Sequence, residues 1–91
     1  MLFRSGCSFD DLYIHIEAQF VDGMNWNNIN EWHIDHIIPV SFSQSKDELL
    51  LLNHYTNLRP LWAKDNLLKG SSITHDAMTH PLYKHIIDLR Q

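Results

Sequence analysis

The chain has 91 residues, enough for a single small domain that buries roughly 60 to 65% of its unfolded surface. Eleven acidic residues against seven Lys and Arg give a formal net charge of -4, which argues against a protein that holds nucleic acid by a broad basic surface. Cys7 is the single cysteine, so an internal disulfide and a Cys-rich zinc site are excluded, and a reducing, cytoplasmic setting is expected. Without a long apolar run or a signal-peptide pattern, neither membrane insertion nor secretion is expected.

The first expected element is a helix over residues 8–22. Ser8 suits the N-cap position, and Gly23 suits the stop. Asp10 and Asp11 lie in the first turn, where the helix dipole favours negative charge. Apolar residues at helical spacing predict that one face packs on the core; they are Phe9, Leu12, Ile16 and Phe20.

The stretch His-Ile-Asp-His-Ile-Ile-Pro, residues 33–39, concentrates metal-ligand and proton-transfer chemistry. Its isoleucines predict an extended strand, which Pro39 closes because proline cannot donate a ladder hydrogen bond. The carboxylate of Asp35 suits a hard divalent cation, and the imidazole of His36 can act as a base. Since neighbouring residues of a regular strand point to opposite faces, a site that uses both side chains requires a strand edge or a bend.

The remaining chain predicts two further helices around a second strand, and then a helical tail. The expected elements are a short buried helix over 46–53, an extended piece over 57–61, a helix over 62–69 and a C-terminal helix over about 80–90. Pro60 is expected to end the second strand, Gly70 to stop the following helix, and Pro81 to lie in the first turn of the last one. The tail helix has an apolar face formed by Leu82, Ile86 and Leu89.

Three blocks in this order carry a family resemblance. They are His33-Ile-Asp-His-Ile-Ile-Pro39, Thr56-Asn-Leu-Arg-Pro-Leu-Trp62 and Ala63-Lys-Asp-Asn-Leu-Leu-Lys-Gly70. Together they resemble the HNH endonuclease family, also called the His-Me finger or ββα-metal fold. The segment from His15 to Trp32 is further similar to small phage and bacterial HNH proteins, so that the resemblance covers about residues 6–70. A lone Asp-His pair is a weak signal, and it is the order of the blocks that makes the resemblance specific.

The resemblance implies a role for each matching residue. Asp35 matches the first metal ligand, and His36 matches the general base that activates water. Asn57 resembles the middle Asn, which in the family holds the active-site loop and orients the base. Asn66 occupies the last motif position, where family members use His or Asn as the second metal ligand. A carboxylate and an amide oxygen suit Mg²⁺, with Mn²⁺ or another transition metal as the alternative.

Substrate contacts are expected from cations close to this motif. Arg59 and Lys69 are candidates for backbone phosphate contacts, since Lys69 lies three residues beyond Asn66 on a similar helical face. Lys64 is a further candidate, weighed against an ordinary solvated cation. His33 shares the strand face of Asp35 and is expected to touch metal or phosphate, or else to play a supporting or packing role.

The resemblance and the element order together predict an α+β fold: a ββα-metal core over about 31–70, flanked by the N-terminal helical region and the C-terminal helix, within one HNH nuclease domain over 1–91. The expected function is metal-dependent endonucleolytic hydrolysis of DNA. The expected partner is DNA, with a further DNA-binding domain or a phage packaging protein as an additional one. Two alternatives stay open: a non-catalytic HNH-fold module that binds nucleic acid or protein in a phage packaging assembly, and an RNA-directed or toxin-type nuclease.

Overall fold

The computed structural model describes residues 8–91, so Arg4 and Cys7 lie outside the described range. The helices are α1 (Phe9–Glu17), α2 (Lys46–Leu52), α3 (Ala63–Lys69), α4 (His75–Thr79) and α5 (Pro81–Leu89), and the strands are β1 (Trp32–His36) and β2 (Leu58–Trp62). Single 3-10 turns cover Trp26–Asn28, Val40–Phe42 and Tyr55–Asn57. The expected α+β class is confirmed. None of the helices in residues 8–91 has the length and hydrophobicity needed to cross a membrane.

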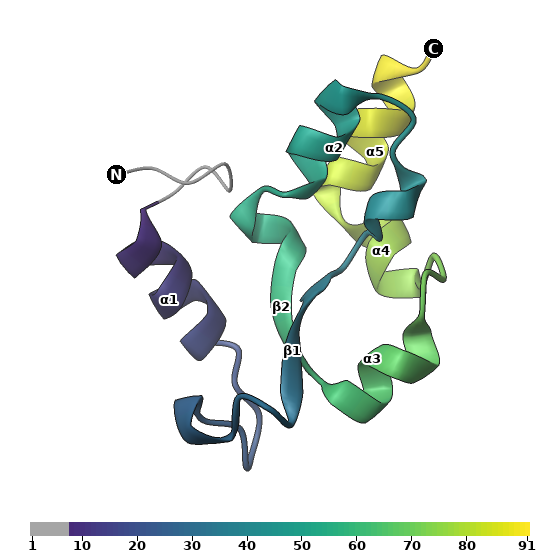
Figure 1. Cartoon of the computed structure of the whole chain (residues 1–91). Helices are drawn as coiled ribbons and strands as arrows, with labels where there is room; N and C mark the ends of the chain where they lie inside the picture. Colours follow the sequence, from purple (N-terminus) through teal and green to yellow (C-terminus); the bar gives the residue numbers. More distant parts are fainter. Residues whose placement is uncertain (1–7) are drawn as a thin grey trace.

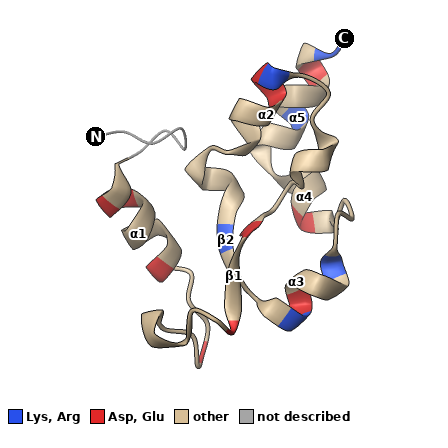
Figure 2. Ribbon diagram, in the orientation of Figure 1, with Lys and Arg blue, Asp and Glu red and all other residues tan. Residues whose placement is uncertain are grey.

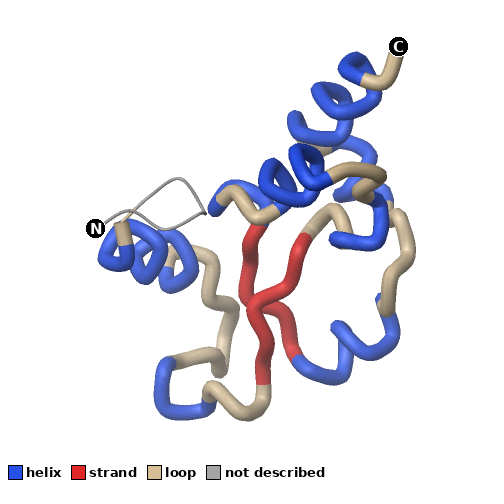
Figure 3. Tube along the Cα trace, turned by 45° about the horizontal axis from the view of Figure 1, so that its top comes forward, coloured by secondary structure: helices blue, strands red, loops and turns tan. Residues whose placement is uncertain are grey.

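The two strands form an antiparallel pair between the helices, and they cross with a pronounced twist (Figure 3). In their register Ile34 lies opposite Pro60, and Asp35 lies opposite Arg59. The expected end of the second strand at Pro60 is therefore wrong. A two-stranded sheet leaves one edge of each strand open, so a proline can lie inside a strand when its nitrogen faces that open edge.

The first of two apolar clusters joins α1 and the following loop to one face of the sheet. Its buried members are Ile16, Met24, Trp32 and Leu58. Phe20 and Trp26 pack against Trp32 edge to face, with ring centroids 5.1 and 5.5 Å away. Buried aromatic area of this kind stabilises a small domain, and here it fixes the start of β1.

The second cluster lies beyond the other end of the strands, where α2, α4 and α5 meet (Figure 1). Its buried members are Ile38, Leu52, Ala77 and Ile86. An ion pair closes this part of the molecule: Arg90 Nε donates to Glu48 Oε2 at 3.0 Å, and an Arg90 amino group donates to the carbonyl of Phe42 at 2.7 Å. The hydrogen bond from Arg90, together with that from the amide of Gln44, holds the pKa of Glu48 below its ordinary value.

Helix α3 follows β2 directly and packs beside β1, where it completes the ββα order (Figure 1). No apolar residue of α3 is buried, and both Leu67 and Leu68 are more than three-quarters exposed. Polar contacts from Asn66 and Lys69 join this helix to β1. The position of α3 therefore depends on polar contacts at the candidate site more than on apolar burial.

Several expected boundaries differ from the structure. Helix α1 ends at Glu17 rather than near residue 22, and β1 ends at His36, with Pro39 three residues further on. Two apolar predictions are wrong, because Phe9 and Leu89 are each 61% exposed. The sequence analysis also missed α4, a five-residue helix that Thr74 caps by accepting a hydrogen bond from the amide of Ala77. Helices this short have too few positions to show a 3.6-residue period.

Candidate functional site at the end of β1

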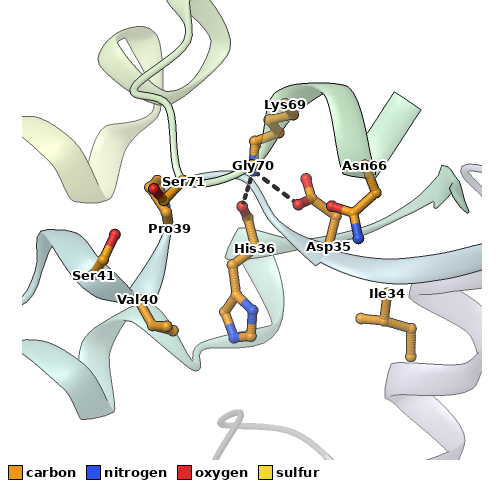
Figure 4. Close-up of a pocket in the computed structure, with 10 residues that line it drawn as sticks. All are labelled: Ile34, Asp35, His36, Pro39, Val40, Ser41, Asn66, Lys69, Gly70 and Ser71. Carbon is orange, nitrogen blue, oxygen red and sulfur yellow. Dashed lines mark hydrogen bonds and ion pairs between the residues drawn. The ribbon is translucent and has the colours of Figure 1, made fainter. Parts of the chain in front are cut away.

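A pocket of about 260 Å³ opens where β1 ends and the chain turns toward α2 (Figure 4). It is lined by Ile34, Asp35, His36, Pro39, Val40, Ser41, Asn66, Lys69, Gly70 and Ser71. The lining thus combines the end of a strand, the loop after it and the end of α3. Three of the four residues predicted to carry the chemistry, Asp35, His36 and Asn66, meet at this pocket.

The carboxylate of Asp35 is 5% exposed and is surrounded by cations. Lys69 Nζ donates to Asp35 Oδ1 at 2.8 Å, and the same ammonium donates to the backbone carbonyl of His36 at 2.7 Å. Arg59 Nε donates to Asp35 Oδ2 at 3.0 Å, and its terminal nitrogen reaches Asp76 at 3.1 Å. Lys69 and Arg59, which were expected to contact phosphate, therefore bind the predicted metal ligand in this structure.

Asn66 projects from α3 beside the Asp35 carboxylate, with its amide oxygen on the Asp35 side (Figure 4). Its amide nitrogen lies 2.9 Å from Nδ1 of His33, which accepts the hydrogen bond. This contact fixes which amide atom faces the pocket, because an amide whose nitrogen is bound to His33 presents its oxygen elsewhere. His33 is exposed and is not among the pocket residues, so the structure gives it the supporting position rather than that of a ligand.

The imidazole of His36 points away from α3, on the side of β1 opposite to the Asp35 carboxylate (Figure 4). This is the alternation expected for neighbouring strand residues. Its Nε2 lies 2.9 Å from the side-chain oxygen of Asn53, at the end of α2. With Nε2 donating to that oxygen, the neutral ring carries its lone pair on Nδ1. The sequence analysis missed Asn53, since no spacing signal relates it to a residue 17 positions earlier.

Asn57 is fully buried just before β2 and binds three backbone groups. Its side-chain oxygen accepts from the amide of Ile38 at 2.8 Å, and its side-chain nitrogen donates to the carbonyls of Ile38 and Leu52 at 3.0 and 2.8 Å. The backbone carbonyl of Asn57 also accepts from Ile37 at 2.9 Å. Asn57 therefore holds the loop after His36, whereas the imidazole itself is bound by Asn53.

The oxygen atoms around Lys69 suit a hard cation. Asp35 Oδ1 and the carbonyl of His36 already bind a positive charge, and the amide oxygen of Asn66 lies next to them. Carboxylate, carbonyl and amide oxygens are the ligands that Mg²⁺ prefers, together with water and phosphate oxygens. Residues 8–91 hold no group of three or more His, Cys, Asp or Glu side chains suited to a metal. By the chemistry of its donors, this set of oxygens suits Mg²⁺ better than zinc, which is bound chiefly by Cys and His.

Few cations remain for binding a polyanion. In residues 8–91 the ion pairs engage Arg59, Lys69, Lys84 and Arg90, which leaves Lys46 and Lys64. Lys64 precedes Asn66 by two residues, about 200° around α3, so it does not face the pocket. Helix α1 carries acidic side chains and has no Lys or Arg (Figure 2).

Two histidines outside the pocket, His15 and His80, make structural contacts. His15 Nε2 lies 3.0 Å from the carbonyl of Leu58 and joins α1 to β2. His80 caps α5 by accepting from the amide of Leu82, and its other ring nitrogen lies 2.8 Å from the carbonyl of Thr56. Both rings therefore make contacts that join separate parts of the fold.

Comparison with known proteins gives limited help. No protein-family model and no solved structure matches the chain. An uncharacterized protein of Acanthamoeba polyphaga mimivirus is 39% identical over 64 residues, which make up 67% of this chain and 28% of that protein. The chain thus spans little more than a quarter of the length of this relative. The name of the relative assigns no activity, so the evidence on function comes from the geometry of the site.

Proposed function

We propose that this chain is an HNH-type endonuclease that hydrolyses phosphodiester bonds of DNA with the help of one divalent cation, Mg²⁺ or in its place Mn²⁺. The observation that supports the proposal is the arrangement at the end of β1. Oxygen donors from Asp35 and Asn66 lie on one side of the strand and the imidazole of His36 on the other, next to one open pocket. Phosphodiester hydrolysis needs these two functions on either side of a phosphate.

Each residue has a defined task in this proposal. Asp35 and Asn66 would hold the cation, which when bound would neutralise charge that develops on the phosphate oxygens. His36 takes a proton from the attacking water through Nδ1, since its Nε2 is bound to Asn53. Asn57 keeps the loop that follows His36 in place, and His33 orients the Asn66 amide. The products are expected to carry 5′-phosphate and 3′-hydroxyl ends.

DNA is the proposed substrate, in the cytoplasm. The described surface offers few unpaired cations, so we expect affinity for DNA to come in part from a further DNA-binding domain or a phage packaging partner. The length of the mimivirus relative is compatible with such an addition.

Conversion of supercoiled plasmid to nicked and linear forms tests the proposal. Wild type is expected to cut with Mg²⁺ or Mn²⁺ and to stop when EDTA is added. His36→Ala is expected to cut at least about 100-fold more slowly, because a general base contributes that much or more. His85→Ala removes an exposed imidazole from α5 and is the matched control, expected to cut like wild type. Equal cutting by wild type and His36→Ala, or no cutting with any divalent metal, would refute the proposal.

A second candidate is a non-catalytic module that binds nucleic acid or a protein partner. The observation that favours it is the pairing of Asp35 with both Lys69 and Arg59, which gives the carboxylate a structural role without any metal. This candidate predicts tight binding that is independent of divalent metal and no cleavage. Gel-shift measurements with EDTA and with Mg²⁺, run beside the plasmid assay on DNA and RNA, separate it from the nuclease.

A further inference from the structure

Lys69 is placed where a bound cation would compete with it. Its ammonium bridges Asp35 Oδ1 and the carbonyl of His36, at 2.8 and 2.7 Å, and its side chain is only 7% exposed. These two oxygens belong to the set that suits a hard divalent ion. A lysine ammonium is a compact point charge that binds oxygen donors much as a small cation does.

We propose that Lys69 occupies the cation position of this site in the metal-free protein and is displaced from Asp35 when a divalent cation binds. This inference rests on the proposed function, because it takes Asp35 to be a metal ligand. Lys69 is thus an internal surrogate for the metal. Until the ion binds, Lys69 neutralises the buried carboxylate of Asp35. The free protein therefore holds no unpaired buried charge at this site.

Charge balance around Asp35 favours the displacement. Lys69 and Arg59 already bring two positive charges to one carboxylate, and Asp76 offsets part of that charge from the far side of Arg59. A divalent ion added to this group would be repelled by an ammonium within hydrogen-bond distance of the same oxygen. Release of one of the two cations removes this repulsion and frees a carboxylate lone pair for the ion.

Lys69 is the cation that the structure allows to move. It lines the pocket, whereas Arg59 does not. Arg59 is bound on both sides, by Asp35 and Asp76, and it lies across from Asp35 in the register of the sheet. Lys69 is the last residue of α3 and carries a flexible four-carbon stem, and α3 buries none of its apolar residues in the core. An ion that enters through the pocket therefore meets Lys69 first.

Displacement also gives Lys69 its second role. Once released from Asp35, the ammonium stays at the mouth of the same pocket, where a phosphate of the substrate would lie. In this proposal the cation binds first, and the freed Lys69 contacts the phosphate afterwards. This explains how one residue can neutralise a buried aspartate in the free protein and bind substrate in the complex.

Amine labelling of the wild-type chain without DNA tests the inference directly. The protein is treated with limiting sulfo-NHS-acetate at constant pH, with and without saturating Mn²⁺, and acetylation is measured for each lysine by peptide mass spectrometry. Exposed Lys64 and Lys46 are controls in the same molecule. Lys69 is expected to be protected in the metal-free protein and to react several-fold faster with Mn²⁺, while Lys64 and Lys46 do not change. Rapid labelling of Lys69 without metal overturns the inference, as does continued protection once calorimetry shows Mn²⁺ bound.

Metal affinity gives an independent readout. Lys69→Met is expected to bind Mn²⁺ about tenfold more tightly than wild type by calorimetry, because the competitor is gone. Lys64→Met removes the same charge from an exposed position of α3 and is expected to bind like wild type. Equal affinities of the two variants, or no Mn²⁺ binding to wild type at millimolar concentration, contradict the inference. If Mn²⁺ binds and frees Lys69 while plasmid stays uncut, the proposed nuclease activity fails and the displacement stands.

Discussion

At the scale of single residues, the partner of His36 decides which ring nitrogen is available to the proposed general base. The side-chain oxygen of Asn53 lies 2.9 Å from His36 Nε2, so the ring keeps its proton there and presents Nδ1. Asn53 is a positioning residue in this account. It does not touch the reacting atoms but selects the tautomer and orientation of the ring that does.

Asn53→Ala is accordingly expected to slow plasmid cleavage by up to about 100-fold, because a misplaced base loses its near-attack geometry. The KM for DNA should change little, since Asn53 is not expected to bind substrate. Asn53→Asp keeps an oxygen acceptor at the same place and should recover much of the rate, whereas a purely structural Asn53 would give no such recovery. Cleavage by Asn53→Ala at the wild-type rate contradicts the assignment.

At the scale of elements, Asn57 connects the loop after β1 to the end of α2. Its three side-chain hydrogen bonds satisfy buried backbone groups of Ile38 and Leu52. Such groups lie in neither a helix ladder nor a strand ladder, so without Asn57 they would be buried and unpaired. One side chain thus replaces the secondary structure that this loop lacks.

Asn57→Ala is expected to lower the free energy of unfolding by about 3 kcal/mol, because removing it leaves buried donors and acceptors unsatisfied. Urea denaturation followed by tryptophan fluorescence measures this. Asn27→Ala, at an exposed asparagine with no side-chain hydrogen bond in the described structure, is the control and should change stability by less than about 0.5 kcal/mol. If both variants are equally stable, Asn57 does not hold the loop.

A second link between elements is the pairing of Glu48 on α2 with Arg90, just after α5. The hydrogen bond from Arg90 lowers the pKa of Glu48 below its ordinary value of 4.5. Because the folded state favours the charged carboxylate, this pair stabilises the fold fully above pH 4.5, and the stabilisation is lost as the pH falls toward the lowered pKa.

Glu48→Gln should therefore melt at a lower temperature than wild type at pH 7, and the difference in Tm should shrink as the pH falls from about 5 to 3. Thermal unfolding followed by circular dichroism across this range is the measurement. Asp47→Asn, an exposed neighbour on α2, serves as the control for loss of a carboxylate. A difference in Tm that is constant across the range shows that the charge of Glu48 is not responsible.

At the scale of the whole molecule, charge limits what the chain can bind alone. The net charge is -4, and among the Lys and Arg side chains of residues 8–91 only Lys46 and Lys64 are free of ion pairs. Phosphate contacts supply most of the non-specific affinity for DNA, and these depend on unpaired Lys and Arg. If the chain acts on DNA as proposed, affinity is expected to come from the metal, from a released Lys69 or from a partner.

Fluorescence anisotropy with a short DNA duplex tests this expectation. In EDTA at 150 mM salt the chain should bind with a Kd of about 10⁻⁴ M or weaker, at the lower limit of non-specific binding. Mg²⁺ should strengthen binding, since it frees Lys69. A sub-micromolar Kd without metal would contradict this expectation and favour the non-catalytic binding module.

The order of elements and the main residues of the candidate site were predictable from the sequence, whereas several side-chain contacts were not. The sequence analysis predicted the fold class and placed β1, β2 and α3 within one to three residues, because Gly70 and the motif blocks mark them, whereas neither Pro39 nor Pro60 marks the end of a strand. It brought Asp35, His36 and Asn66 to one site. It missed the His36 to Asn53 contact and the binding of Lys69 to Asp35. These depend on how α2 and α3 pack against the strands, and neither spacing nor composition encodes such long-range side-chain choices.

The central claim is that the end of β1 is a metal-dependent catalytic centre. It is tested most directly by locating Mn²⁺ in crystals of the chain by its anomalous scattering. The account predicts a peak within about 2.5 Å of the Asp35 carboxylate and the Asn66 amide oxygen, with the Lys69 ammonium no longer on Asp35. Crystals that bind Mn²⁺ elsewhere or not at all, with Lys69 still paired to Asp35, would contradict it.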